Sequence, residues 1–267
     1  MYMTPRRAGP ALVLPLFLLS AMTATGCDIV TAERKHQETA EWRKTYELRS
    51  GGRVEVRNTN GQIKVEPSTG KTVEVIAVKS ARGHSPEDAK QALDDIEIVD
   101  SADSNGVRIE TKIRRSQGWF GSNAQVKYTV RVPDGLNSKF ATTNGGVELR
   151  GVSGNVEAET TNGGIVAHEI AGAFVGSTTN GGVEVDMVRL DDGGARLECT
   201  NGGISLRLPA DAKASILATV TNGGIDTGGL ALEKIESSRR KLEAKLNGGG
   251  APVRMSCTNG GLEIRSR

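Results

Sequence analysis

The side chains that could do acid–base or metal chemistry are few and far apart in this sequence of 267 residues. Its three histidines, His36, His84 and His168, lie in three different segments. The best carboxylate pair is Asp191-Asp192, in the stretch VRLDDGG, whose composition favours a loop. An enzyme needs acids and bases that converge in one cleft, so we expect no catalytic residue and no cofactor. A polysaccharide-cleaving enzyme that uses the two aspartates is the less favoured alternative.

A short motif, TNGG, returns along the second half of the chain. Its asparagines are Asn144, Asn162, Asn180, Asn201, Asn222 and Asn259, and a shorter echo, NTNGQI, holds Asn60. The first three are 18 residues apart, the next two steps are 21 residues, and the last step is 37 residues. A short fixed period is the signature of stacked structural units, so the motif predicts a repeat architecture.

The motif could form a metal-binding loop or a corner of the backbone. A calcium-binding glycine-rich repeat needs an acidic ligand at a fixed place, but here that place holds Val166 and Ser205 as well as acidic residues such as Glu184. We therefore expect no metal site. Asparagine and glycine tolerate the left-handed region, so Asn-Gly-Gly can turn sharply. Corners stacked about 4.8 Å apart would let the asparagine amides form a hydrogen-bonded ladder.

Alternate residues are apolar or small on both sides of each corner. The pattern is clear in Val156, Ala158 and Thr160 before one corner, and in Val183 and Val185 after another. Period-2 alternation predicts two half-buried strands per unit. A third apolar point follows at Val152, Ile170 and Val188. Three short sides around one apolar interior predict an all-β fold with a parallel β-solenoid (β-helix) over residues 141–267, which we expect to be right-handed.

Extra residues enter the longer units at one corner. The insertions 188–194, 208–215 and 228–247 all follow the second strand of a unit. Extra length at one corner projects from one edge of a solenoid, and such edges often bind partners. The candidate binding residues on this edge are Asp191, Asp192, Asp211, Lys213, Arg239 and Arg240. A solvated loop edge without a partner is the alternative.

Residues 45–140 form a β region without the repeat, with one helix at about 85–96. Ser85 caps the helix and Pro86 lies in its first turn, which are standard start signals. The helix is suited to covering an exposed strand edge. The stretch RRSQGWFGSN holds Trp119 and Phe120 between two glycines. This tip could contact a partner or a membrane, or fold back onto the core.

The first 26 residues have the pattern of a secretory signal peptide: two arginines, an apolar stretch, then small residues. Ala24-Thr25-Gly26-Cys27 resembles a bacterial lipobox, so we expect a lipid on Cys27 and a polar tether over residues 27–44. An ordinary cleaved signal with an incidental cysteine is the alternative. Removal of Arg6 and Arg7 would bring the formal net charge from +2 to zero, which does not favour nucleic-acid binding.

Two further cysteines, Cys199 and Cys257, lie two residues before their asparagines. In sequence, the unit with Val220 lies between them. Two units of separation is about 9.5 Å, beyond the limit of about 7 Å for a disulfide, so we expect both to be unpaired core residues.

Several segments resemble the bacterial "putative adhesin" family of β-strand-repeat proteins, a domain family of unknown function. They are GGRVEVRNTNGQIKV (51–65), GWFGSNAQVKYTVRVP (118–133), the TNGG units and LNGGGAPVRMSCTNGGLEIRS (246–266). The resemblance covers about residues 45–267, which we expect to form one continuous domain. It implies a β-helical protein of the cell envelope.

These observations predict an exported, non-enzymatic lipoprotein whose rigid solenoid presents a binding or scaffold surface. We expect its lipid to hold it in the membrane, facing the periplasm or the cell surface, with an envelope glycan or protein as partner. The alternatives are a periplasmic envelope-stress accessory, a self-assembling scaffold and, less favoured, a β-helical polysaccharide-acting enzyme.

Overall fold

The computed structural model describes residues 36–114 and 124–267. The predicted signal peptide, Cys27 and the tip residues Trp119 and Phe120 lie outside the described residues. Within the described part, no helix has the length and apolar character needed to cross a membrane.

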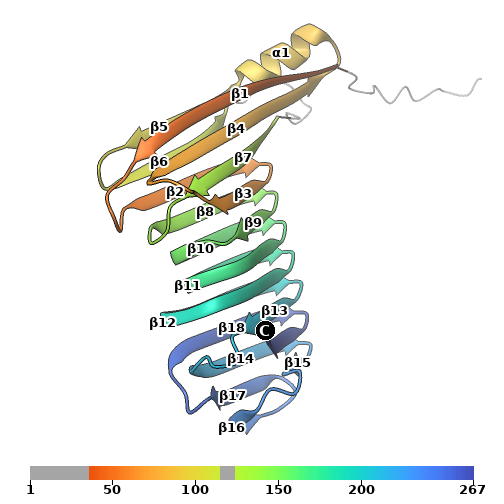
Figure 1. Ribbon diagram of the computed structural model, residues 1–267. Coiled ribbons are helices and arrows are strands. Elements are labelled where there is room, and N and C mark those ends of the chain that lie inside the picture. Colours follow the sequence, from red (N-terminus) through yellow and green to blue (C-terminus); the bar gives the residue numbers. More distant parts are fainter. Residues whose placement is uncertain (1–35, 115–123) are drawn as a thin grey trace, which may run out of the picture. The chain divides into compact units, whose positions relative to one another are not determined.

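The described part is nearly all-β, with one helix and nineteen strands in a single sheet of mixed orientation (Figure 1). The first strands are β1 (His36–Glu47), β2 (Arg53–Asn60), β3 (Ile63–Pro67), β4 (Thr72–Gly83), β5 (Ile96–Ala102), β6 (Gly106–Ile113), β7 (Gln125–Val132), β8 (Asn137–Asn144) and β9 (Val147–Arg150). The others are β10 (Ser153–Asn162), β11 (Ile165–Asn180), β12 (Val183–Asn201), β13 (Ile204–Leu208), β14 (Ala214–Asn222), β15 (Ile225–Asp226), β16 (Leu232–Ser237), β17 (Lys241–Leu246), β18 (Ala251–Asn259) and β19 (Leu262–Ser266).

The TNGG units pair in parallel and in register. Asn162 of β10 lies beside Asn144 of β8 and Asn180 of β11, and Asn180 lies beside Asn201 of β12. After the corner, Ile165 of β11 pairs in the same way with the strands on either side. We call the strands β8–β15 together with β18 and β19 the parallel block; they form most of the stack of strands in the lower part of Figure 1.

The last unit of the sequence is not the last unit of the stack. Strand β18 lies between β12 and β14, and β19 lies between β13 and β15. Cys257 therefore pairs in register with Cys199 on one side and with Val220 on the other. The prediction that the Val220 unit separates the two cysteines is wrong, because the chain leaves a gap after β12 and fills it later with β18.

The sheet is not parallel throughout, as a pure parallel β-solenoid would require. Antiparallel pairs form at both ends of the stack: β1 with β4, β4 with β7 and β5 with β6 at one end, and β14 with β17 and β16 with β17 at the other. An open edge in the block would expose unpaired backbone groups. These antiparallel strands occupy the ends where such edges would otherwise lie.

Helix α1 (Pro86–Asp94) lies at the N-terminal end and packs against β4 and β1. Ser85 is its N-cap, and the Ser85 hydroxyl accepts a hydrogen bond of 3.0 Å from the backbone N–H of Asp88. Ala89 and Leu93 are its buried residues. The helix is shorter than the predicted range, because the chain turns at Asp95 and Ile96 already begins β5.

The core of the parallel block is filled by inward side chains that alternate in size. Phe140 lies beside Ala158, and Ala158 lies beside Gly176. A Cβ at Gly176 would meet the ring of Phe174 at 3.0 Å, so the small residues make room for the two buried phenylalanine rings. Close packing of this kind fixes the register of the strands.

One inward position differs from the prediction. Met187 is fully buried, whereas Val188 is 37% exposed. The pairing of β11 with β12 shifts register on both sides of Ile170, which pairs with Met187. The shift moves the inward position by one residue, since side chains alternate between the two faces of a strand.

Candidate functional site

The asparagine amides form one ladder along the corner of the stack. Asn144 donates from Nδ2 to Oδ1 of Asn60 at 2.8 Å, and Asn162, Asn180 and Asn201 each donate to the preceding asparagine at 2.8–2.9 Å. The ladder then continues out of sequence order, with Asn259 donating to Asn201 and Asn222 donating to Asn259, both at 2.8 Å. It therefore runs through all seven units.

The ladder asparagines do not adopt the left-handed region of backbone conformation. The prediction of a corner assumed that they would. Among the described residues, only Glu169 and Asn247 are non-glycine residues with positive φ. In four of the seven corners the glycine after the asparagine has a positive φ instead: 118° at Gly61, 148° at Gly181 and Gly202, and 149° at Gly260. The asparagine contributes hydrogen bonds, and the glycine contributes the turn.

The first glycine of each corner is sterically required. A Cβ at Gly163, Gly181 or Gly202 would lie 2.0 Å from the carbonyl oxygen of the equivalent glycine in the neighbouring unit. Such an approach is far below van der Waals contact and involves backbone atoms that cannot move aside. The stacking of the units therefore excludes any side chain at this position.

The second glycine of each corner is not required in this way. A Cβ would meet its nearest neighbour at 3.5 Å at Gly164, 3.4 Å at Gly203 and 3.9 Å at Gly261, and would meet nothing within 4 Å at Gly224. None of these glycines has a positive φ. In the first unit the same position carries Gln62, whose Nε2 donates to Glu148 Oε2 at 3.0 Å. The corner thus accepts a side chain where most units have none.

The second glycines border a groove on the surface of the parallel block. It measures about 780 Å³ and is lined by residues of β11, β12, β13, β19 and β15 and the turns before them. The glycines in this lining are Gly164, Gly182, Gly203, Gly261 and Gly224, which we call the second-glycine row. Five strands spaced about 4.8 Å apart give a groove roughly 19 Å long that crosses the strands.

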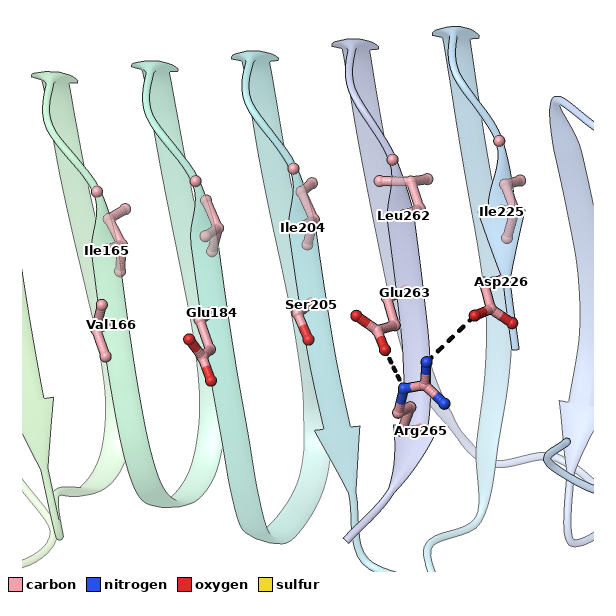
Figure 2. A pocket seen from close by; sticks show the side chains of 16 residues that line it. Ile165, Val166, Glu184, Ile204, Ser205, Ile225, Asp226, Leu262, Glu263 and Arg265 are labelled. Atoms are coloured by element: carbon pink, nitrogen blue, oxygen red, sulfur yellow. Dashed lines mark hydrogen bonds and ion pairs between the residues drawn. The ribbon is translucent and has the colours of Figure 1, made fainter. Parts of the chain in front are cut away.

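Two rows of side chains run parallel to the second-glycine row (Figure 2). The residues next to the glycines are aliphatic, as at Ile165, Ile204 and Leu262, and these three are buried. The residues one step further form an outer row that begins with Val166 and is otherwise polar, with Glu184 and Ser205 beside each other. The groove therefore offers bare backbone, an aliphatic base and a polar margin.

Charge gathers at one end of the groove. Arg265 donates to Asp226 Oδ2 at 3.3 Å and also to Glu263. Further along, Arg207 donates to Glu184 at 3.1 Å. All of these side chains are at least one third exposed, so each ion pair contributes little to stability and its partners remain accessible to a ligand.

The predicted binding-edge residues lie elsewhere. Asp191 and Asp192 are exposed and belong to the continuous strand β12, not to a loop. Asp211 and Lys213 lie in the connection between β13 and β14, and Arg239 and Arg240 lie in the turn between β16 and β17, all four exposed. None of the six lines the groove.

Asp191 does not have the character of a general acid. Arg189 donates to Asp191 at 2.8 and 3.3 Å. These hydrogen bonds hold the pKa of the Asp191 carboxyl below its usual range, whereas a general acid at neutral pH needs a raised pKa. Across residues 36–114 and 124–267, no three His, Cys, Asp or Glu side chains are grouped so that they could hold a metal ion.

Sequence reasoning missed the groove, although one signal was visible. The second glycine was treated as part of the corner, because it follows the first in nearly every unit. The exception is Gln62, which shows that the corner does not need a second glycine.

The chain shares its fold with a solved structure. No family model and no curated protein matches it. The crystal structure described as a "putative cell adhesion protein" from Clostridium sporogenes matches with a TM-score of 0.51 at 13% identity, over 86% of this chain and 100% of the other. A "putative adhesin" from Bacteroides fragilis matches with a TM-score of 0.31 at 10% identity, over 85% and 97% of the two chains. One from Parabacteroides merdae gives 0.30 at 8% identity, over 84% and 95%.

Proposed function

We propose that this protein is a non-enzymatic, adhesin-like protein of the cell envelope that binds an extended polymer along the second-glycine row. The name of the Clostridium sporogenes protein, with which the chain shares a fold, is in keeping with adhesion. The observation that carries the proposal is the row of glycines that the fold does not need. Five neighbouring corners have no side chain at this position, whereas the first corner carries Gln62 at the equivalent position.

Bare backbone in a strand lets another chain approach closely. The repeat of the groove is the strand spacing of about 4.8 Å, so its hydrogen-bonding groups recur at short, equal intervals. A ligand that matches this surface is itself an extended polymer with regularly spaced polar groups. Both a glycan chain and an extended polypeptide have this character.

The lining favours hydrogen bonding over ring stacking. None of the described residues that line the groove is aromatic. The lining supplies hydroxyl, carboxylate and guanidinium groups from Ser205, Glu184, Glu263 and Arg265. A sugar site built from stacked aromatic rings is therefore not the arrangement we propose. The ligand would lie on the glycine backbone and form hydrogen bonds with the polar side chains of the outer row.

We regard the parallel block as a short, right-handed β-solenoid that acts as a rigid platform for this groove. Its in-register parallel pairs and continuous asparagine ladder support the assignment. We further propose that Cys27 carries a lipid that holds the platform at the membrane. Replacement of Cys27 by alanine should then move the protein from the membrane fraction to the soluble fraction, whereas Cys257→Val should leave it membrane-bound.

Binding to arrays of envelope glycans, such as peptidoglycan and lipopolysaccharide fragments, and of extended peptides tests the groove. The informative variants are Gly203→Gln and Gly261→Gln, which fill it with the side chain that the first unit already carries. Gly146→Gln is the control, since Gly146 is a second glycine outside the groove lining. Its Cβ would lie 3.2 Å from the Gly164 carbonyl oxygen, so the thermal stability of this variant is measured before its binding.

We expect the groove variants to lose at least tenfold in affinity for whichever class binds, with unchanged thermal stability, and the control to bind normally. Equal binding by all variants would remove the groove from the proposal. Protease shaving of intact and permeabilised cells then distinguishes a partner outside the cell from one in the periplasm.

A further inference from the structure

Cys199 and Cys257 meet in the core of the parallel block, where both are free thiols in this structure, as predicted. They pair in register on β12 and β18, and their side chains are only 6% and 2% exposed. They are 58 positions apart in the sequence and become neighbours because β18 fills the gap between β12 and β14. The two described cysteines therefore lie in the pairing of β12 with β18.

The equivalent inward position is held by threonine in three other units. Thr142, Thr160 and Thr178 each donate a hydrogen bond of 2.7–3.1 Å to the carbonyl of a first glycine. Cys199 and Cys257 point at the equivalent carbonyls of Gly181 and Gly202, with sulfur–oxygen distances of 3.4 Å. A thiol is a weak donor, so this hydrogen bond gives no reason to prefer cysteine. In the unit on the far side of Cys257, the position holds Val220, whose side chain has no donor.

The spacing of the two residues allows a covalent bond. Neighbouring strands keep paired Cα atoms about 4.8 Å apart, inside the usual disulfide range of about 4.4–6.8 Å. Both side chains point to the same face of the sheet, because they are paired in register. Parallel side chains keep their Cβ atoms about as far apart as the strands, about 4.8 Å. This is slightly beyond the usual Cβ separation of about 3.5–4.5 Å in a disulfide, so closing the bond requires a small approach of the two strands.

We propose that Cys199 and Cys257 form a disulfide that ties β18 to β12. The bond would hold β18 in place after this strand has paired between β12 and β14. The exported location proposed above is one in which such bonds persist.

The oxidant in this step is a small disulfide such as oxidised glutathione. One cysteine thiolate attacks a sulfur of that disulfide, forms a mixed disulfide and releases one glutathione thiolate. The second cysteine thiolate then attacks the protein sulfur and expels the second glutathione. The cysteine pair loses two protons and two electrons in total, and the two glutathione molecules gain them.

Access to the thiols sets the timing of the exchange. Burial, followed by the neighbouring Cys257 thiol, raises the pKa of the Cys199 thiol to about 12. At neutral pH very little thiolate is present while the strands are closed, and thiolate is the reactive form. The bond therefore forms as the chain folds, when β18 is entering its slot.

The test is refolding of the full chain from denaturant in a buffer with excess oxidised glutathione. We expect proteolysis and mass spectrometry to find one peptide pair, linked through Cys199 and Cys257. The oxidised protein should melt about 5–10 °C above the reduced protein, as a disulfide across a long loop does in a domain of this size. Reductant should reverse the shift.

Two variants serve as controls: Cys257→Val, the residue of the next unit, and Cys199→Thr, the residue of three other units. Neither should respond to the oxidant. Recovery of both cysteines as free thiols or as glutathione adducts, or bonds mainly to Cys27, would overturn the proposal. An equal melting shift in Cys257→Val would do so as well.

Discussion

The corner at Asn60 and the corners that border the groove have the same backbone construction and different surfaces. Both place an asparagine in the ladder and a first glycine against a neighbouring backbone. The first corner adds Gln62, and its backbone carbonyl accepts from Tyr128 N–H at 2.9 Å. The groove corners add a second glycine and leave their outer side open. The comparison shows that stacking of the units requires the asparagine and the first glycine, whereas the next position can differ between corners.

The largest effect expected from this comparison concerns the two glycines of one corner. Gly202→Ala would push a Cβ to 2.0 Å from the Gly181 carbonyl oxygen, so the free energy of unfolding should fall by about 3 kcal/mol or more. Gly203→Ala meets only ordinary contact at 3.4 Å and should change it by less than about 1 kcal/mol in either direction. Urea unfolding of the two variants checks the difference. Similar losses would show that the second glycine is also structural.

A smaller effect should distinguish the middle of the asparagine ladder from its end. Asn180 both donates to Asn162 and accepts from Asn201, whereas Asn222 only donates, to Asn259. Each of these bonds contributes about 0.5–1.5 kcal/mol, and all are exposed, so the low end applies. Asn180→Ala should therefore cost about twice as much as Asn222→Ala in thermal unfolding. Equal costs would mean that the amides act through the turn and not through the ladder.

The antiparallel strands β1 and β5 hold a charged contact whose contribution to stability should depend on pH, unlike that of the uncharged asparagine ladder. Asp100 of β5 accepts from Lys44 Nζ at 2.6 Å and from the Tyr46 hydroxyl at 3.0 Å. The hydrogen bond from Lys44 lowers the pKa of Asp100, against a smaller opposing effect of burial.

Because this pKa is lower in the folded state, the stabilisation is complete above the unfolded value of about 3.9. It is lost as the pH falls through the folded value. Lys44 is half exposed, so the contribution should stay below about 1 kcal/mol. Asp100→Asn should remove this pH-dependent stabilisation. The free energy of unfolding of the variant should therefore fall less between pH 7 and pH 3 than that of the unchanged protein. A loss as large as in the unchanged protein would assign the acid sensitivity to other groups.

The smallest effect is expected for Gln62→Gly, which gives the first corner the surface of the others. It removes the exposed hydrogen bond to Glu148 and adds chain entropy to the unfolded state, for a loss of about 1 kcal/mol or less. Circular dichroism should show an unchanged fold. A large loss would mean that Gln62 is required where it stands, and the first corner would no longer inform us about the others.

The strands and corners could be predicted because their causes are local. Alternation places Val156 and Ala158 inside, and the Asn-Gly pair marks where each strand turns. The order of the stack could not be predicted in this way. The 37-residue step between Asn222 and Asn259 contains β16 and β17, but spacing alone does not say on which side of β14 the chain returns.

The site escaped prediction for a different reason. Length inserted at a corner suggested an exposed edge, yet Asp191 and Asp192 lie within β12, whose pairing with β11 absorbs the extra residues through register shifts. The groove is bordered by glycines, which have no side chain. A search for residue types that can do chemistry therefore does not find it. Only a comparison of each glycine with the space around it separates the two glycines of the motif.

The out-of-order position of β18 and β19 has a consequence for folding during synthesis. Strand β14 leaves the ribosome well before residues 251–266, yet its parallel partner is among those last residues. Local pairs such as β10 with β11 can close early, while this contact has a high contact order and is slow to form. Until the final residues arrive, the facing edges of β12 and β14 remain open, and an incomplete chain would keep them open.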